Sequence, residues 1–552
     1  MSYGLGSGPG GATLSELGCY NDRAEGGPCA SSALLACAQP HWIKEHRVPS
    51  FCITPSESKN PNLNGVTGNR LWGHFPAYDV LQLPHNEGLT AGTYQDFKLC
   101  FTAASDIRNV VQTINNLPRS YQGTCDILLN EQDTISANRN LVILYRPELA
   151  VHLMYSSRLT SSMAAYLQRC VHMIYGDAPR GVDMIFQRTF PTRGRGRLSS
   201  AQPAMAIKHP VEMFLSRCDA SRAMRRMKDV LFDPARLDER HRLLAALEPP
   251  HRLAHIYLWK TGVLAPFSLD LSSFNQPNRL AFTPQGSWLG KRSDLSPLHG
   301  WDVTRVRASG LKNGIDPAGD IFGSLFFHIK QELKEFITRI KDFDINIHHT
   351  QYDPRLLSKG VTIGVLPSFT NAMFDRIDIG DMGDKFGVAE CIEDWGALLD
   401  KRNPHSCILA HSVSWIDSRP SPSRSFSSPE KVLEPLKWKC RNIPSLGQRL
   451  KAMLQQGSYS PPVLRLIESL DAFVDSGPSF QEFLASRKVY STCLSVGLHQ
   501  RERHNVHPKR FGIPLDAPSQ ALPDVSKEEY YNLLTTGGAD LTTRFMEFEV
   551  AA

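Results

Sequence analysis

Two short apolar runs separated by an amphipathic segment give the clearest structural signal in the chain. Runs of this kind are typical of buried strands, and they predict strands at 98–103 and 125–130. Between them, residues 106–117 have the periodicity of a helix with one apolar face, formed by Ile107, Val110, Val111, Ile114 and Leu117. The pattern therefore predicts a strand, a tight turn, a helix and a second strand, which together make a βαβ unit.

Later segments continue this alternation of strands and helices. Apolar runs predict three further strands at 345–350, 374–379 and 406–412, and residues 321–342 form a long amphipathic pattern typical of a helix. Short strand-to-helix turns favour a single α/β domain with a mostly parallel sheet, flanked by the helices at 106–117 and 321–342. Residues 176–320 would then be a large helical insertion in that sheet.

Composition divides the rest of the chain. Residues 1–40 are rich in Gly and Ser and are expected to be flexible, and 418–430 reads as a low-complexity linker. The Rossmann-like domain is predicted over 41–417, and a mostly helical C-terminal region over 431–552.

Polar side chains follow the first two predicted strands at the point where each strand ends. In doubly wound sheets a cofactor lies at this carboxyl edge, so the candidate cofactor-binding residues are Ser105, Asp106, Arg108, Asn130 and Glu131. Glu131 would hold ribose hydroxyls. The structural alternative is that Asp106 caps a helix and pairs with Arg108, while Glu131 belongs to a polar turn.

The turn after the first strand lacks the glycines that let a backbone approach a nucleotide. It reads Thr102-Ala103-Ala104-Ser105-Asp106. Alanine occupies space that glycine leaves open and restricts access to positive φ. We therefore expect no bound cofactor.

Charge and composition narrow the possible partners. The 552 residues carry a net charge of +6, which is too mild to indicate a nucleic-acid partner. No apolar run is long enough for a membrane span, and the N-terminus lacks the features of a secretory signal. Twelve scattered cysteines fit reduced thiols, so a cytoplasmic location is expected.

The order of predicted strands and their acidic ends resembles a class I methyltransferase-like sheet. Phe374-Asp375-Arg376-Ile377 is similar to the fourth-strand motif of those enzymes, and Asn403-Pro404-His405 is similar to their approach to the fifth strand. Larger blocks resemble a fungal family of unknown function, related to the N-terminal domain of dynein axonemal assembly factor 3. These blocks lie at 42–51, 71–88, 106–118 and 374–384, with further similarity at 128–140 and 318–333.

The resemblance implies a Rossmann-type, methyltransferase-like fold, often preceded by a MYND-type zinc finger. It supplies no reaction. Relatives carry glycines where this chain has Ala103-Ala104-Ser105, and Asn-Asp where it has Asn130-Glu131. The first difference weakens the case for a cofactor further, whereas the second is conservative.

Other clusters have structural explanations that we prefer. Six residues could belong to a zinc finger that has lost part of its motif: Cys19, Cys29, Cys37, His41, His46 and Cys52. Because no C-x2-C pair exists in the chain, no metal site is expected. Five aspartates near predicted strand ends are interpreted as solvated carboxylates: Asp353, Asp375, Asp378, Asp381 and Asp384. Loop residues that would line a pocket or pack over the sheet edge are Trp72, Gly73, Asp79, Asn86 and Glu87.

Two basic clusters complete the set of candidates. The sequence RGRGR occupies 193–197, and Arg222, Arg225, Arg226 and Lys228 form a second cluster. Both fit a solvated basic face better than an RNA contact.

Together these features favour a cytoplasmic protein of unknown activity with a degenerate methyltransferase-like domain, acting through contacts with a protein partner or in assembly. The alternative is an S-adenosylmethionine-dependent methyltransferase, or another transferase using the same crevice. An RNA-binding protein is the third hypothesis. No catalytic residue is identified, and the sequence does not decide whether the chain is an enzyme.

Overall fold

The computed structural model describes residues 40–53, 71–73, 75–176, 185–191, 194–290, 296–370, 372–419, 429–440 and 444–551. The flexible segment predicted at 1–40 and most of the linker predicted at 418–430 lie outside these residues. So do Cys19, Cys29 and Cys37 of the suggested zinc finger.

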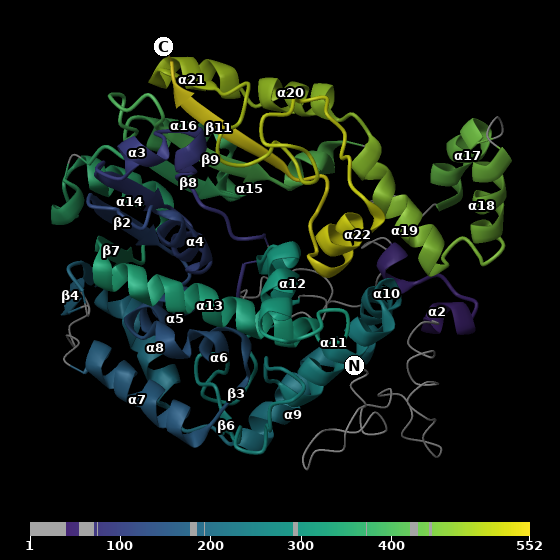
Figure 1. Cartoon of the computed structure of the whole chain (residues 1–552), viewed down its shortest axis with the longest axis horizontal. Helices are drawn as coiled ribbons and strands as arrows, with labels where there is room; N and C mark the ends of the chain where they lie inside the picture. The colour runs from purple at the N-terminus through teal and green to yellow at the C-terminus, as the bar shows by residue number, and fades with distance from the viewer. Residues whose placement is uncertain are drawn as a thin grey trace.

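A nine-stranded sheet with the order β10-β11-β9-β8-β1-β2-β7-β5-β4 organises the molecule (Figure 1). Its strands are β1 (Phe97–Phe101), β2 (Thr124–Asn130), β4 (Ile185–Pro191), β5 (Arg197–Pro203), β7 (Asp344–Thr350), β8 (Arg376–Gly380), β9 (Cys407–Ser412), β10 (Leu498–Gln500) and β11 (Arg544–Val550). All neighbouring strands from β9 to β5 are parallel, whereas β4 is antiparallel to β5, and β11 is antiparallel to both of its neighbours. The short strands β3 (Arg158–Leu159) and β6 (Gln276–Pro277) form a separate antiparallel pair.

The prediction of an α/β protein with a mostly parallel sheet is confirmed. All five predicted strands are present, as β1, β2, β7, β8 and β9, and they are adjacent in one sheet. The two predicted flanking helices are α4 (Arg108–Asn116) and α13 (Ile321–Asp342). Helix α4 begins two residues later than predicted, because Asp106 lies in the turn that precedes it.

Four strands of the nine-stranded sheet were not predicted, because their polar residues hide the apolar pattern. β5 reads RLSSAQP, yet Ser200 and Gln202 are completely buried within the sheet. β11 contains Arg544 and Glu547, both buried, and it lies in a region expected to be mostly helical. The hairpin β4–β5 comes from the predicted insertion, and β10 and β11 come from the C-terminal region.

Helices cover both faces of the sheet. Alternate residues of one strand enter different cores: Leu99 and Phe101 of β1 face the core that contains α4 and α13, whereas Cys100 faces the opposite core. The first core also takes in α5 (Thr134–Tyr145), α6 (Ala150–Tyr155), α7 (Ser161–Tyr175) and α8 (Ala204–Leu215). The second contains α14 (Pro354–Thr362), α15 (Met382–Phe386), α16 (Val388–Gly396), α20 (Gly477–Ser486) and α21 (Val489–Val496).

A further group of helices lies mainly to one side of the sheet in Figure 1. They are α9 (Ala220–Leu231), α10 (Leu237–Ala246), α11 (Pro249–Thr261), α12 (Val303–Lys312), α17 (Pro429–Cys440), α18 (Pro444–Leu454), α19 (Pro461–Leu470) and α22 (Lys527–Tyr530). The block at 42–51 begins with α2 (His41–Lys44), from which Trp42 donates a 2.8 Å hydrogen bond to the carbonyl of Tyr459. Among the described residues, no helix is both long enough and apolar enough to span a membrane.

The glycines of RGRGR have a packing role. A Cβ at Gly194 would lie 2.2 Å from the carbonyl oxygen of Ile340, and one at Gly196 would lie 1.8 Å from that of Ile345. Residues 194–196 therefore lie against the α13–β7 junction at a distance that only glycine permits at Gly194 and Gly196. Arg195 and Arg197 remain exposed.

Candidate functional site

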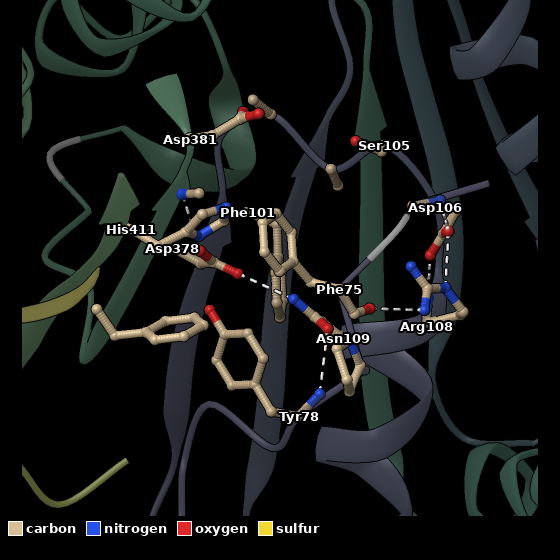
Figure 2. A pocket seen from close by; sticks show the side chains of 16 residues that line it. Phe75, Tyr78, Phe101, Ser105, Asp106, Arg108, Asn109, Asp378, Asp381 and His411 are labelled. Carbon is tan, nitrogen blue, oxygen red and sulfur yellow. Dashed lines mark hydrogen bonds and ion pairs between the residues drawn. The ribbon is translucent and has the colours of Figure 1, made fainter. Parts of the chain in front are cut away.

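A small cavity of about 90 Å³ lies at the carboxyl edge of the sheet, beyond the ends of β1, β8 and β9 (Figure 2). Its walls come from the turn after β1, the start of α4, the ends of β8 and β9, Gly73 and residues 75–78. The lining residues are Gly73, Phe75, Pro76, Tyr78, Phe101, Ala103, Ala104, Ser105, Asp106, Arg108, Asn109, Asp378, Gly380, Asp381, His411 and Phe545. This is the edge at which the sequence predicted a ligand site.

Residues 75–78 close one side of the cavity with an aromatic side chain. The ring of Phe75 meets the His411 ring edge-on, with centroids 4.4 Å apart, and Phe545 packs against both rings. The backbone N–H of Ala77 donates to the carbonyl of Gly300 at 3.1 Å, which attaches the segment to the helical region. Apolar rings therefore fill space beside the turn where a larger ligand would extend.

Asp106 and Arg108 form a buried ion pair, with Arg108 Nε 2.8 Å from Asp106 Oδ2. The same guanidinium donates to the carbonyls of Phe75 and Gly300, and Asp106 accepts a 2.7 Å hydrogen bond from the N–H of Gly73. Burial alone would raise the pKa of Asp106, but the Arg108 charge and the N–H donors hold it below its usual value. The pair thus joins three segments through interactions within the chain.

Asn130 is completely buried, and its hydrogen bonds are all intramolecular. Its Nδ2 donates to the carbonyls of Thr102 and Tyr352, at 2.9 and 3.0 Å. Its Oδ1 accepts from the Thr350 hydroxyl and from the Tyr352 N–H, at 2.9 and 3.0 Å. Since an amide side chain offers two donors and two principal acceptor positions, Asn130 fixes the ends of β1, β2 and β7 and has nothing left for a ligand.

Glu131 bonds to its own turn. Its Oε1 accepts a 2.8 Å hydrogen bond from the N–H of Asp133, and Asp133 in turn caps α5. Burial raises the pKa of Glu131 to about 8, helped by the negative charges of Asp133, Asp381 and Asp106. A carboxyl group that is neutral at physiological pH is a poorer acceptor for ribose hydroxyls than a carboxylate.

The five predicted site residues are thus divided. Ser105, Asp106 and Arg108 line the cavity, whereas Asn130 and Glu131 belong to the neighbouring turns and do not line it. Ser105 is exposed. Of the loop residues, only Gly73 reaches the cavity, since the Trp72 ring packs on Tyr155 at 5.3 Å and Glu87 forms a buried ion pair with Arg376 at 2.9 Å.

Sequence reasoning missed the polar centre of the cavity. Asp378 Oδ2 accepts a 3.2 Å hydrogen bond from Asn109, and Oδ1 accepts one of 3.0 Å from the Gly380 N–H. Tyr78 lies beside this carboxyl group, and burial raises the pKa values of both Asp378 and Tyr78. Asp378 was recognised only as one of several acidic residues. The available signals were the positions of Asn109, in the first turn of the predicted helix 106–117, and of His411, near the end of the predicted strand 406–412.

The five aspartates near predicted strand ends do not converge on one point. Asp353 caps α14, and Asp384 accepts hydrogen bonds from the backbone N–H groups of Val413 and Ser414 at 2.8 and 3.0 Å. Asp375 lies before β8, where it accepts from the Lys98 N–H at 2.8 Å. Within the described part of the chain, no three His, Cys, Asp or Glu side chains are placed to hold a metal ion.

The raised pKa of Glu131 predicts a pH-dependent effect of Glu131→Gln. The unfolded chain loses this proton near pH 4.3, and the folded protein loses it near pH 8, so wild-type stability should fall as the pH rises between these values. Glutamine keeps an acceptor for the Asp133 N–H without titrating. We expect the variant to gain about 1–3 kcal/mol in free energy of unfolding at pH 8, relative to wild type, and almost nothing at pH 4.

Urea denaturation at both pH values measures this difference, with the exposed Glu393→Gln as the matched control. An equal effect of Glu131→Gln at both values would show that Glu131 ionises normally.

Residues 71–158 match the model of a domain of unknown function, DUF4470. The matched segment contains Gly73, Phe75, Tyr78, the turn after β1 and the start of α4, and so about two thirds of the cavity wall. No curated protein and no solved structure matches the chain.

Proposed function

We propose that this chain is a methyltransferase-like Rossmann protein that has no nucleotide cofactor and acts through contacts with other proteins. The strand order supports the methyltransferase-like fold in this proposal. Without the β4–β5 hairpin, the sheet runs β7-β2-β1-β8-β9-β11-β10, with β11 antiparallel between two parallel strands. This resembles the class I methyltransferases, in which the last strand of the chain inserts antiparallel beside the fifth. The resemblance to the dynein assembly factor branch adds an assembly role in the cytoplasm to the proposal.

The second part of the proposal, that the protein has no nucleotide cofactor, rests on the hydrogen bonds of the residues in the crevice. Asp106, Arg108 and Asn130 all bond to neighbouring segments, and Glu131 bonds to its own turn. The space that remains is about 90 Å³, well below the roughly 300–1,000 Å³ typical of ligand pockets. A nucleoside cofactor would have to displace Phe75 and break the Asp106–Arg108 pair before it could enter.

The runner-up is an S-adenosylmethionine-dependent methyltransferase. One observation favours it: the cavity lies at the expected edge and contains a buried carboxyl group, Asp378, beside Tyr78. An RNA-binding role loses support, because packing explains the glycines of RGRGR.

Isothermal titration calorimetry with S-adenosylmethionine and S-adenosylhomocysteine separates the two readings. We expect no binding heat for either compound. A micromolar dissociation constant would overturn the proposal if Glu131→Ala weakened it by about 1–3 kcal/mol, the usual loss for a charge-assisted hydrogen bond. Binding unaffected by Glu131→Ala would place the ligand elsewhere and would also contradict a protein without cofactor.

A further inference from the structure

The outer edge of β4 is an unpaired strand edge. β4 is the last strand of the sheet and pairs on its inner side with β5 over seven consecutive residue pairs, from Ile185–Pro203 to Pro191–Arg197. Within the described residues, no strand pairs with its other side. Its backbone N–H and C=O groups on that side can therefore pair with another chain.

This edge lacks most of the features that usually prevent pairing. Protected edge strands carry charged side chains, bulges or an internal proline, but the register of β4 with β5 is unbroken and its proline lies at the last position. Its one charged side chain, Arg188, is half-buried, where it donates to the carbonyl of Ile174 at 3.1 Å and lies over the ring of Phe190. Ile185, Gln187 and Thr189 form an exposed and uncharged row, and Ile185 keeps 54% of its surface exposed. Phe186 and Phe190 point into the core and hold the strand in place.

An apolar cavity opens beside the end of this strand. It has a volume of about 40 Å³, and its walls combine Phe190 and Leu198 of the hairpin with Ile337 and Ile340 of α13. Arg146 and Lys341 also line it. One small apolar side chain would fill the space.

Basic side chains lie at the same end of the hairpin. Arg195 and Arg197 are exposed at the β4–β5 turn, and Gly194 and Gly196 hold that turn against the sheet. Glu148 is the single acidic residue among those that line the cavity. The electrostatic surroundings thus favour a negatively charged partner.

We propose that β4 pairs with an extended acidic segment of a partner protein, which adds a tenth strand to the sheet. Main-chain hydrogen bonds along β4 supply affinity. An apolar side chain of the segment enters the cavity beside Phe190, and its carboxylates face Arg195 and Arg197. This inference rests on the proposed interaction role and names the chemistry of the partner.

Fluorescence anisotropy with the full chain tests the pairing. The probe is a labelled heptapeptide of alternating Glu and Val, compared with the same peptide carrying Lys in place of Glu. We expect the acidic probe to bind at least about tenfold more tightly than the basic one, with affinity that falls as salt is added. No binding of the acidic probe, or equal binding of both, overturns the proposal.

N-methylated probes separate strand addition from simple charge attraction. Because alternate amides of an added strand face β4, methylating one alternate set should weaken binding at least about tenfold, and methylating the other set should not. Unchanged binding of both methylated probes would contradict strand pairing.

Charge reversal locates the site. R195E/R197E should weaken the acidic probe at least about tenfold, while R225E/R226E on α9 makes the same change of charge at another exposed basic cluster and should have little effect. Equal losses in both variants would assign binding to overall charge.

A homodimer that Ile185→Lys dissociates would assign β4 to a second copy of the chain and overturn the inference. Cofactor binding in the calorimetric test would refute the proposed function without changing these results, so the two failures are distinguishable.

Discussion

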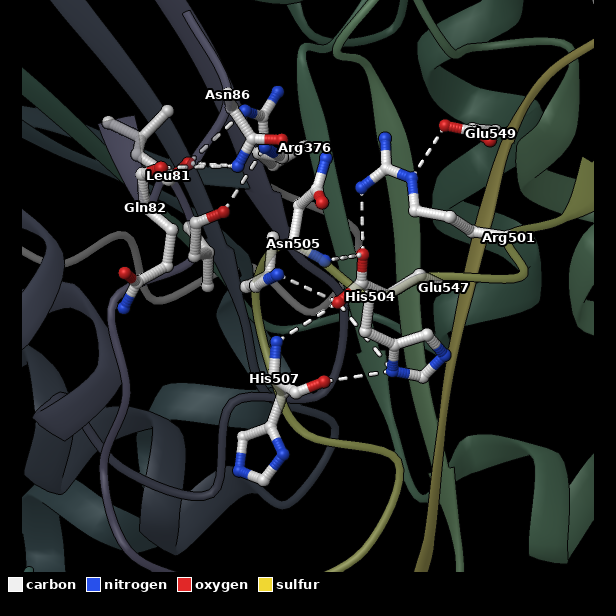
Figure 3. Close-up of polar contacts among 12 residues, drawn as sticks. Leu81, Gln82, Asn86, Arg376, Arg501, His504, Asn505, His507, Glu547 and Glu549 are labelled. Carbon is white, nitrogen blue, oxygen red and sulfur yellow. Dashed lines mark hydrogen bonds and ion pairs between the residues drawn. The ribbon is translucent and has the colours of Figure 1, made fainter. Parts of the chain in front are cut away.

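Replacing Glu547 by Gln is expected to lower the free energy of unfolding by about 3–5 kcal/mol, the usual cost of breaking a buried ion pair. Glu547 lies on β11 and is 1% exposed. Its Oε2 accepts from Arg501 at 2.7 Å and from the Asn505 N–H at 3.0 Å, and its Oε1 accepts from the N–H groups of Val506 and His507 at 2.8 and 3.0 Å (Figure 3). Either orientation of a glutamine amide would turn its NH₂ group toward two donors.

The matched control is Glu549→Gln, two residues along the same strand. Glu549 also bonds to Arg501, at 2.5 Å, but its side chain keeps 23% of its surface exposed. We expect a loss below about 1 kcal/mol there, because water can replace the lost contact. Chemical denaturation of both variants at pH 7 measures the difference, and similar losses would show that Glu547 has no special place in the fold.

The Glu547 effect should also depend on pH. Burial opposes ionisation, but His504, the backbone N–H groups and Arg501 hold the pKa of Glu547 below its usual value. A lowered carboxyl pKa stabilises the folded protein at every pH above the unfolded value, about 4.3, and this contribution disappears as the pH falls through the folded value. The difference between wild type and Glu547→Gln should therefore be constant above about pH 6 and shrink in acid.

Glu547 also shows why the outer strands of the sheet, β11 among them, escaped prediction. Apolar runs identify strands that are buried through hydrophobic side chains, such as CDILLN in β2. β11 is buried as well, but it uses Glu547 and Arg544, whose partners come from distant parts of the chain. A local pattern contains no sign of those partners, so the segment falls within the region that the sequence predicts to be mostly helical.

The position of the candidate site could be predicted from the sequence, but the hydrogen-bond partners of its residues could not. Alternating strands and helices located the carboxyl edge, and Ser105, Asp106 and Arg108 do line a cavity there. The spacing could not reveal that Asp106 accepts a hydrogen bond from the Gly73 N–H. Nor could it reveal that Arg108 donates to the carbonyls of Phe75 and Gly300. Nor could it reveal Tyr78, which reaches Asp378 across 300 residues of sequence through the packing of a loop.

Arg108→Met tests the role that the structure gives to this residue. The variant leaves Asp106 buried without its counter-charge, so the free energy of unfolding should fall by about 3–5 kcal/mol. Adding Asp106→Asn removes the second charge while it keeps an acceptor for the Gly73 N–H. The double variant should therefore recover at least about half of that loss, since a pair of neutral residues avoids the cost of a lone buried charge.

Thermal denaturation of these proteins with and without S-adenosylmethionine completes the test. A ligand that binds only the folded state raises the melting temperature, by an amount that depends on its concentration relative to its dissociation constant. If Arg108 serves only to join the turn after β1 to Phe75 and Gly300, the compound should leave the melting temperature of wild type and of both variants unchanged. A rise in wild type that Arg108→Met removes would instead make Arg108 a ligand-binding residue. A double variant no more stable than Arg108→Met would show that the ion pair with Asp106 is not what holds this turn together.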